Sequence, residues 1–156
     1  MVVRKKKKSV EVPIYAVREK KQGEFIPVDS GAAENVWPEN YRQEIPLLQA
    51  DQAKASSRYV AANGEVMTNK GRKLVHFRTG GEKSIKAMEF QVTQVKKPLA
   101  SVRRVVERGN KVVFSKEGSY IEAPDGRRTQ LVEHNGTFAL EIAYAEEALG
   151  FTRRAI

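Results

Sequence analysis

The three aspartates of this chain are the first candidates for chemistry, because the sequence has no cysteine and only two histidines. Asp125 lies in Pro-Asp-Gly, which is typical of a turn, and Asp51 lies in a polar stretch. Asp29 differs, because it follows an apolar segment and precedes Ser30-Gly31-Ala32. A carboxylate at the end of a buried strand costs free energy unless it is hydrogen-bonded or takes part in a reaction. Asp29 is therefore a candidate catalytic group, and an ordinary Asp-Ser-Gly turn is the alternative.

Other reactive groups are scarce. The absence of cysteine excludes a thiol nucleophile and any cysteine-ligated metal. We expect His76, in a predicted strand, and His134, beside an Asn-Gly turn, to be ordinary strand or surface residues rather than ligands. The sequence therefore predicts no metal and no cofactor.

The net charge of +9 is unevenly distributed along the 156 residues. Five cations form one run near the start, and they are Arg4, Lys5, Lys6, Lys7 and Lys8. Such a run repels itself and is typical of a solvated tail, so we assign residues 1–9 to a basic flexible tail. It could contact nucleic acid or an acidic surface by releasing counterions, serve as a nuclear address, or simply aid solubility.

No apolar run approaches the roughly 20 residues that span a bilayer. The charged start has no apolar segment behind it, so it does not resemble a secretory signal. We expect an intracellular protein, cytoplasmic or nuclear, that has no contact with a membrane.

Short alternating apolar segments separated by glycine turns predict a mainly β domain. Asn63-Gly64 predicts a hairpin with a type I′ turn. Residues 98–108 form the best helix, with Ser101 as its N-cap and Gly109 just after its end. The predicted strands are 10–17, an edge strand because of its proline, then 25–28, 58–62, 65–67, 73–78, 87–95, 111–115, 119–123, 130–133 and 137–143. A short helix is expected at 144–151, and Trp37-Pro38 is expected to stop the segment 32–36.

The segment Phe25-Ile26-Pro27-Val28-Asp29-Ser30-Gly31-Ala32-Ala33-Glu34-Asn35-Val36 resembles the active-site segment of retropepsin-type aspartic proteases. The later elements also follow the order of that family. A hairpin at 58–78 stands where the family has its flap, and a strand at 87–95 follows it. Pro98-Leu99-Ala100-Ser101-Val102 then leads into a helix. The amino-acid sequence around these residues is most similar to the protease region of copia-type retrotransposon polyproteins. The resemblance covers about residues 23–122.

This resemblance implies a retropepsin-like closed barrel, the half of an acid protease, with one C-terminal helix and extra C-terminal β-hairpins. We expect a retropepsin-like domain at 10–122 and a C-terminal β-hairpin extension packed on it at 123–156. Only one Asp-Ser-Gly exists in the chain. The resemblance therefore implies a homodimer in which two copies of Asp29 share a proton and activate a water molecule.

The resemblance also assigns roles to individual residues. Ser30 would form a hydrogen bond across the two-fold axis, Gly31 would let backbone amides approach the carboxylates, and Ala32 would leave room for substrate. The expected flap tip is Ala61, Ala62, Asn63 and Gly64, and the expected wall of the substrate pocket is Leu99, Ala100 and Ser101. The substrate would be an extended peptide or polyprotein, and the setting would be retroelement polyprotein processing or a domesticated descendant of a retroelement.

Two alternatives remain open at the level of sequence. The chain could keep the retropepsin fold without catalysis, as a basic structural or nucleic-acid-associated component of a larger assembly. It could also be a basic β-barrel binder unrelated to proteases, although this leaves the ordered resemblance unexplained.

Overall fold

The computed structural model describes residues 24–61, 63–80, 82, 84–145 and 153–156. The basic tail, the predicted edge strand at 10–17 and most of the predicted helix at 144–151 lie outside these residues. Within the described part, the prediction of a mainly β fold is confirmed, and the described residues contain one short helix.

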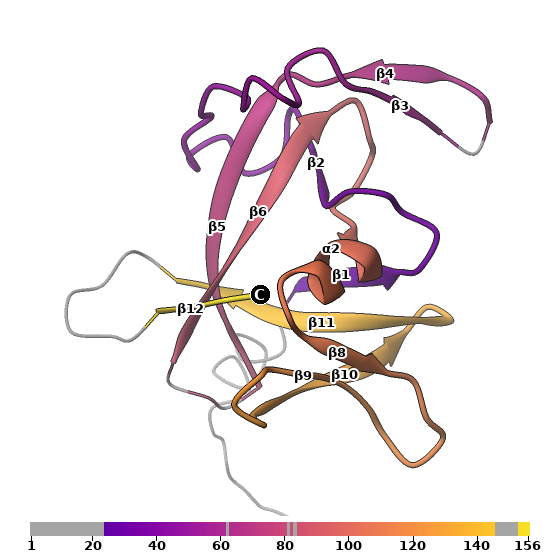
Figure 1. Ribbon diagram of the computed structural model, residues 1–156, viewed down its shortest axis with the longest axis vertical. Coiled ribbons are helices and arrows are strands. Elements are labelled where there is room, and N and C mark those ends of the chain that lie inside the picture. Colours follow the sequence, from indigo (N-terminus) through magenta and orange to yellow (C-terminus); the bar gives the residue numbers. More distant parts are fainter. Residues whose placement is uncertain (1–23, 62, 81, 83, 146–152) are drawn as a thin grey trace, which may run out of the picture.

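One large sheet dominates the described chain and curls into a half-barrel, and the helix lies against its strands β7 and β8 (Figure 1). Its ten strands are β1 (Glu24–Asp29), β2 (Val36–Pro38), β5 (Gly71–Thr79), β6 (Ile85–Thr93), β7 (Ala100–Ser101), β8 (Lys111–Val113), β9 (Ser119–Glu122), β10 (Arg128–His134), β11 (Thr137–Tyr144) and β12 (Arg153–Ala155). A separate two-stranded sheet consists of β3 (Arg58–Val60) and β4 (Val66–Thr68), and the helix is α2 (Val102–Glu107).

The strand β11 joins the first described strand to strands that come later in the chain. It pairs antiparallel with β1, β5 and β10, and its partners include Glu24 opposite Ile142. The expected C-terminal extension at 123–156 therefore shares one continuous sheet with the earlier strands.

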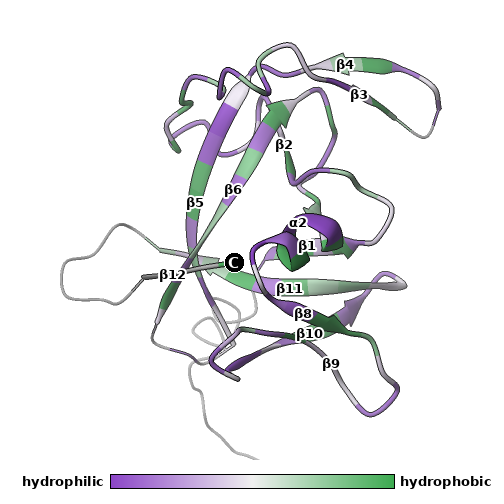
Figure 2. Cartoon of the chain, in the orientation of Figure 1, coloured by the Kyte–Doolittle hydropathy of each residue, from purple (hydrophilic) through white to green (hydrophobic). Residues whose placement is uncertain are grey.

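The core lies between the curled faces of this sheet, where Figure 2 shows apolar residues recurring along the strands. Trp37 is fully buried beside Phe90, with the ring centroids 5.0 Å apart, as expected of a residue packed beneath Val36. The prediction that Trp37-Pro38 ends the preceding segment is wrong, because both residues belong to β2. Proline is tolerated there because β2 is a short strand at the margin of the sheet.

The helix is shorter at its start than predicted. Residues 100–101 form β7, which pairs with β1, so α2 begins only at Val102. Ser101 is the N-cap as predicted, and its hydroxyl accepts a hydrogen bond from the Arg104 amide at 3.2 Å. Gly109 follows the helix with a φ of 97°, a left-handed conformation that glycine adopts readily.

The two Asn-Gly turns differ from each other. Asn135 and Gly136 both have positive φ, 51° and 78°, as a type I′ turn requires. In the hairpin at Asn63-Gly64, only Gly64 has a positive φ, which is 87°. The Gly64 amide donates a hydrogen bond to the Ala61 carbonyl at 2.9 Å. The predicted type I′ turn at Asn63-Gly64 is therefore wrong, because this hairpin closes through a longer loop.

Candidate active site

Asp29 lies at the end of β1, where the chain leaves the sheet to form a loop that returns at Val36. The segment that contains β7 lies between the two arms of this loop. On one side Val28 and Asp29 pair in parallel with Ala100 and Ser101. On the other side Val36 and Leu99 exchange two backbone hydrogen bonds of 3.0 Å. Two segments about 70 positions apart in sequence thereby fix the position of the carboxylate.

The Asp29 side chain is half-buried and is oriented by its own loop. Its Oδ1 accepts a hydrogen bond from the Gly31 amide at 2.7 Å, whereas Oδ2 accepts none from the described residues. A Cβ atom at position 31 would lie 3.3 Å from this Oδ1, which is tighter than an ordinary contact. A glycine at this position therefore leaves room for the backbone amide to approach the Asp29 carboxylate.

Ser101 holds the Asp29 loop in place through two hydrogen bonds. Its hydroxyl donates to the Ala32 carbonyl at 2.7 Å, and its amide donates to Oδ1 of Asn35 at 2.7 Å. Asn35 in turn donates from Nδ2 to the Glu89 carbonyl at 3.0 Å. These bonds are shielded from solvent and connect the loop to β6 and to the start of α2.

The other predicted site residues have different environments. Ser30 is exposed and forms no hydrogen bond with the described chain, so its hydroxyl is available to a second molecule. Ala32 and Leu99 are half-buried. Ala100 and Ser101, expected in the pocket wall, are fully buried in the single chain, and Ser101 acts there by positioning the loop.

Of the segment 58–78 that was predicted as the flap hairpin, residues 58–68 form the β3–β4 hairpin, whereas residues 71–78 belong to β5 of the large sheet and pair with β6. The β3–β4 hairpin projects from the upper part of the molecule toward the same side as the loop after β1 (Figure 1). Tyr59 and Met67 form one directly opposed pair, and Met67 is buried. Val60 and Val66 form the next pair and are 70% and 55% exposed, which leaves apolar surface near the tip. Of the expected tip residues, Ala61 is half-buried, Asn63 and Gly64 are exposed, and Ala62 lies outside the described residues.

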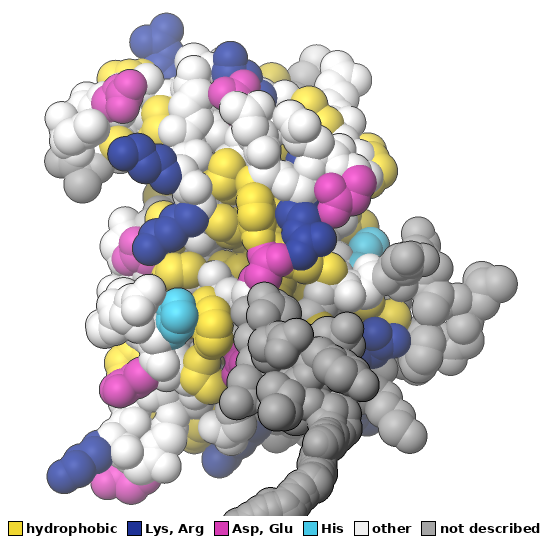
Figure 3. Space-filling view, turned by 180° about the vertical axis from the view of Figure 1, so that it is seen from behind, with side chains coloured by type: hydrophobic (Ala, Val, Ile, Leu, Met, Phe, Trp, Pro, Cys, Tyr) yellow, Lys and Arg dark blue, Asp and Glu magenta, His cyan; other side chains and the backbone are white. Residues whose placement is uncertain are grey.

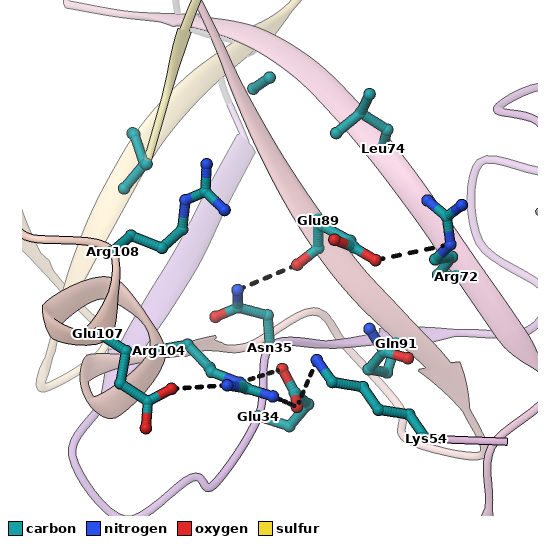
Figure 4. A pocket seen from close by; sticks show the side chains of 12 residues that line it. Glu34, Asn35, Lys54, Arg72, Leu74, Glu89, Gln91, Arg104, Glu107 and Arg108 are labelled. Carbon is teal, nitrogen blue, oxygen red and sulfur yellow. Dashed lines mark hydrogen bonds and ion pairs between the residues drawn. The ribbon is translucent and has the colours of Figure 1, made fainter. Parts of the chain in front are cut away.

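An ion-pair network behind the loop was not predicted. Glu34 is buried and accepts hydrogen bonds on both carboxylate oxygens from Arg104, which also donates to Glu107 (Figure 4). Hydrogen bonding to Glu34 is the main cause that raises the pKa of Arg104, and Lys54 approaches Glu34 to 3.3 Å. The pattern of residues along a helix does not reveal a partner 70 positions away in the chain, so the local sequence could not indicate this ion pair.

The described part of the chain contains no group of three or more histidine, cysteine or acidic side chains that could hold a metal ion. His134 stacks on Phe25 with ring centroids 3.8 Å apart, and His76 lies within β5, so each is a strand histidine as expected. Among the described residues, no helix has the length and apolarity that crossing a membrane requires. No protein-family model, curated protein or solved structure matches the chain.

Proposed function

We propose that the chain is a retropepsin-like aspartic endopeptidase that acts as a homodimer, with one Asp29 from each subunit in the active site. The observation that carries the proposal is the state of the Asp29 carboxylate. It is held at the end of a strand by the Gly31 amide, with one oxygen unpartnered in the described chain. Because the sequence holds no second Asp-Ser-Gly, the second carboxylate must come from another molecule.

Two neighbouring carboxylates supply both functions that hydrolysis of a peptide bond needs. Close like charges resist ionising together, so the pair retains one proton over a range of pH. The ionised carboxylate removes a proton from water as it attacks the carbonyl carbon, and the protonated carboxyl donates to the carbonyl oxygen. The Gly31 amide orients the carboxylate for this exchange.

The proposed substrate is an extended peptide, for example a polyprotein segment of a retroelement. Such a peptide can pair through its backbone with a hairpin and with the chain that follows Asp29, while alternate side chains enter pockets. The exposed pair Val60 and Val66 on the hairpin suits apolar substrate side chains. Closure of the hairpin over the peptide would exclude water from the carboxylates.

A mixing experiment tests whether each site needs two copies of Asp29. Wild-type protein is mixed with an equal amount of the Asp29→Asn variant under exchange conditions, and cleavage of a peptide library is measured at constant total protein. If both carboxylates are required, activity falls to about one quarter, the statistical share of wild-type dimers. Independent subunits would retain about one half.

Two further measurements accompany the mixture. Asp29→Asn alone should lose cleavage by at least about 100-fold, since the general base is removed, and a statine-containing peptide should inhibit the wild type. Wild-type rates in the Asp29→Asn variant, or a monomer at every concentration in sedimentation, would contradict the proposal.

The sequence alternative, a non-catalytic component bound to nucleic acid, would give the opposite pattern. It predicts no cleavage and binding that weakens steeply with added salt. On the face in Figure 3, basic and acidic side chains alternate around an apolar band, so the described residues of that face form no continuous basic surface. In that alternative the contacts are made by the basic residues 4–8, which lie outside the described residues.

A further inference from the structure

A pocket of about 490 Å³ lies between α2 and the strands β5 and β6, behind the loop that carries Asp29. Asp29 does not line it, and neither do the residues of the hairpin β3–β4. Its volume falls in the range of ordinary ligand sites. The proposed peptidase site therefore does not account for this pocket.

Two arginines approach the pocket from opposite walls with unused hydrogen-bond donors (Figure 4). Arg108 follows the last residue of α2, and its backbone amide donates to the Arg104 carbonyl at 3.2 Å, but its guanidinium forms no hydrogen bond or ion pair with the described residues. Arg72, on β5, uses its Nε toward the Gln49 carbonyl at 3.1 Å, and its two Nη groups donate to no described residue. Arginine presents several fixed N–H donors, so these groups are suited to an anion or to carbonyl oxygens.

Glu89 supplies an unused acceptor in the same pocket. Its Oε2 is shielded from solvent and accepts no hydrogen bond, although it lies 3.7 Å from Arg72 Nε. A buried carboxylate oxygen without a donor is costly. The Glu89 side chain as a whole is 35% exposed, so a rotation that brings this oxygen to a ligand N–H in the pocket would be favourable. Leu74, which is 40% exposed, lines the same cavity together with Ala87 and Ile156 and adds apolar surface.

We propose that this pocket binds an acidic peptide segment. A side-chain or terminal carboxylate binds Arg108, backbone carbonyl and amide groups bind Arg72 and Glu89, and an adjacent apolar side chain packs on Leu74. This combination of donors, an acceptor and apolar surface fits a peptide better than a free anion. The inference does not depend on catalysis at Asp29.

Nucleic acid fits the same pocket less well. Glu34, Glu89 and Glu107 line it, and these carboxylates would oppose a chain of phosphates. No aromatic side chain is among the lining residues, so no surface for base stacking is present.

The test uses the full chain with Asp29→Asn, so that cleavage cannot consume the probe. Two hexapeptide mixtures are compared that differ only in Asp or Asn at one fixed position next to a valine. Binding is followed by the NMR methyl signals of Leu74, Ala87 and Ile156, which locate the ligand in the pocket. We expect the Asp mixture to shift these signals. The Asn mixture should bind at least about tenfold more weakly.

Adding Arg108→Gln should weaken binding of the Asp mixture by about tenfold or more. Arg103→Gln is the matched control, because Arg103 lies on the same helix outside the pocket and should leave binding unchanged. Equal binding of both mixtures, no shift with either, or no effect of Arg108→Gln in a protein that melts normally would overturn the proposal. Inorganic phosphate and a single-stranded oligonucleotide are tested as competitors, and equal or stronger binding by either would also overturn it.

Discussion

Arg104 and Glu34 form a two-pronged ion pair, in which Nε and Nη2 of the arginine donate to the two carboxylate oxygens at 2.9 and 2.7 Å. The pair connects the helix that follows β7 to the loop that follows Asp29. Bidentate arginine–carboxylate geometry fixes the orientation of both groups as well as their separation. The described chain thus stabilises the back of the candidate active site by a charged contact.

Removing this contact should destabilise the fold. Arg104→Met leaves the buried Glu34 carboxylate without its main donor, and we expect a loss of about 1–3 kcal/mol in the free energy of unfolding. Urea unfolding measures it. Arg103→Met is the control, because its side chain is 69% exposed, and an exposed ion pair contributes less than about 1 kcal/mol. Equal losses in both variants would contradict the structural role of the pair.

Gly31→Ala tests the approach of the backbone to the carboxylate. The added Cβ would lie 3.3 Å from Asp29 Oδ1, so the carboxylate or the loop must move by a few tenths of an ångström. We expect little change in melting temperature and a fall in peptide cleavage of up to about 100-fold, because small misplacements of reacting groups are costly. Ala33→Ser, at an exposed position in the same loop, should keep wild-type rates. Undiminished cleavage by Gly31→Ala would show that this approach is unimportant.

Ser101→Ala removes two hydrogen bonds at once. The helix loses its N-cap, and the Ala32 carbonyl loses a buried donor at 2.7 Å. A loss of about 1–3 kcal/mol in the free energy of unfolding is expected. Thermal unfolding followed by circular dichroism measures the effect. Ser56→Ala, at an exposed position without a side-chain hydrogen bond to the described residues, should stay within about 0.5 kcal/mol of wild type.

The stability of the fold should depend on pH through Glu107. Hydrogen bonds from Arg104 and then Arg103 lower the pKa of this carboxyl from its ordinary value of 4.5. A depressed folded pKa means that the unfolded state binds more protons, so stability rises with pH in this window. The contribution is therefore complete above the ordinary value and is lost as pH falls through the lower folded value.

Urea midpoints of wild type and Glu107→Gln compared at about pH 6 and about pH 3 test this direction. The difference between them should shrink at the lower pH. Glu133→Gln, which removes an exposed carboxylate without an ion pair to the described residues, should show the same difference at both. A gap that widens toward acid would reverse the assigned sign.

Local patterns predicted the strands well, because alternation and glycine turns act within a few residues. The segments expected at 73–78 and 137–143 lie within β5 and β11. The start of the helix was misplaced because pairing of β7 with β1 overrode helix propensity at residues 98–101. Sequence singled out Asp29, Gly31 and Ser101 as site residues, but it assigned Ser101 to a pocket wall, not to the hydrogen bonds that hold the loop.

The residues that sequence reasoning missed have partners far away in the chain. The local sequence does not distinguish Glu34 from the other acidic residues. Only the fold shows that Glu34 is buried against Arg104. Lys86 likewise lies within a strand and is 1% exposed, with its amine paired to Glu82. Neither charge would be placed in the interior from its local sequence, because burial of a charge depends on a partner that only the fold supplies.

The position of β7 between the two arms of the Asp29 loop has a consequence for biosynthesis. As the polypeptide emerges from the ribosome, its early residues cannot hold that loop, because Ser101 and the β11 partner of Glu24, Ile142, are still to be translated. Contacts of such long sequence separation form slowly, since closing the intervening loops costs entropy. The loop that carries Asp29 should therefore acquire its native conformation late, after almost the whole described chain has been synthesised.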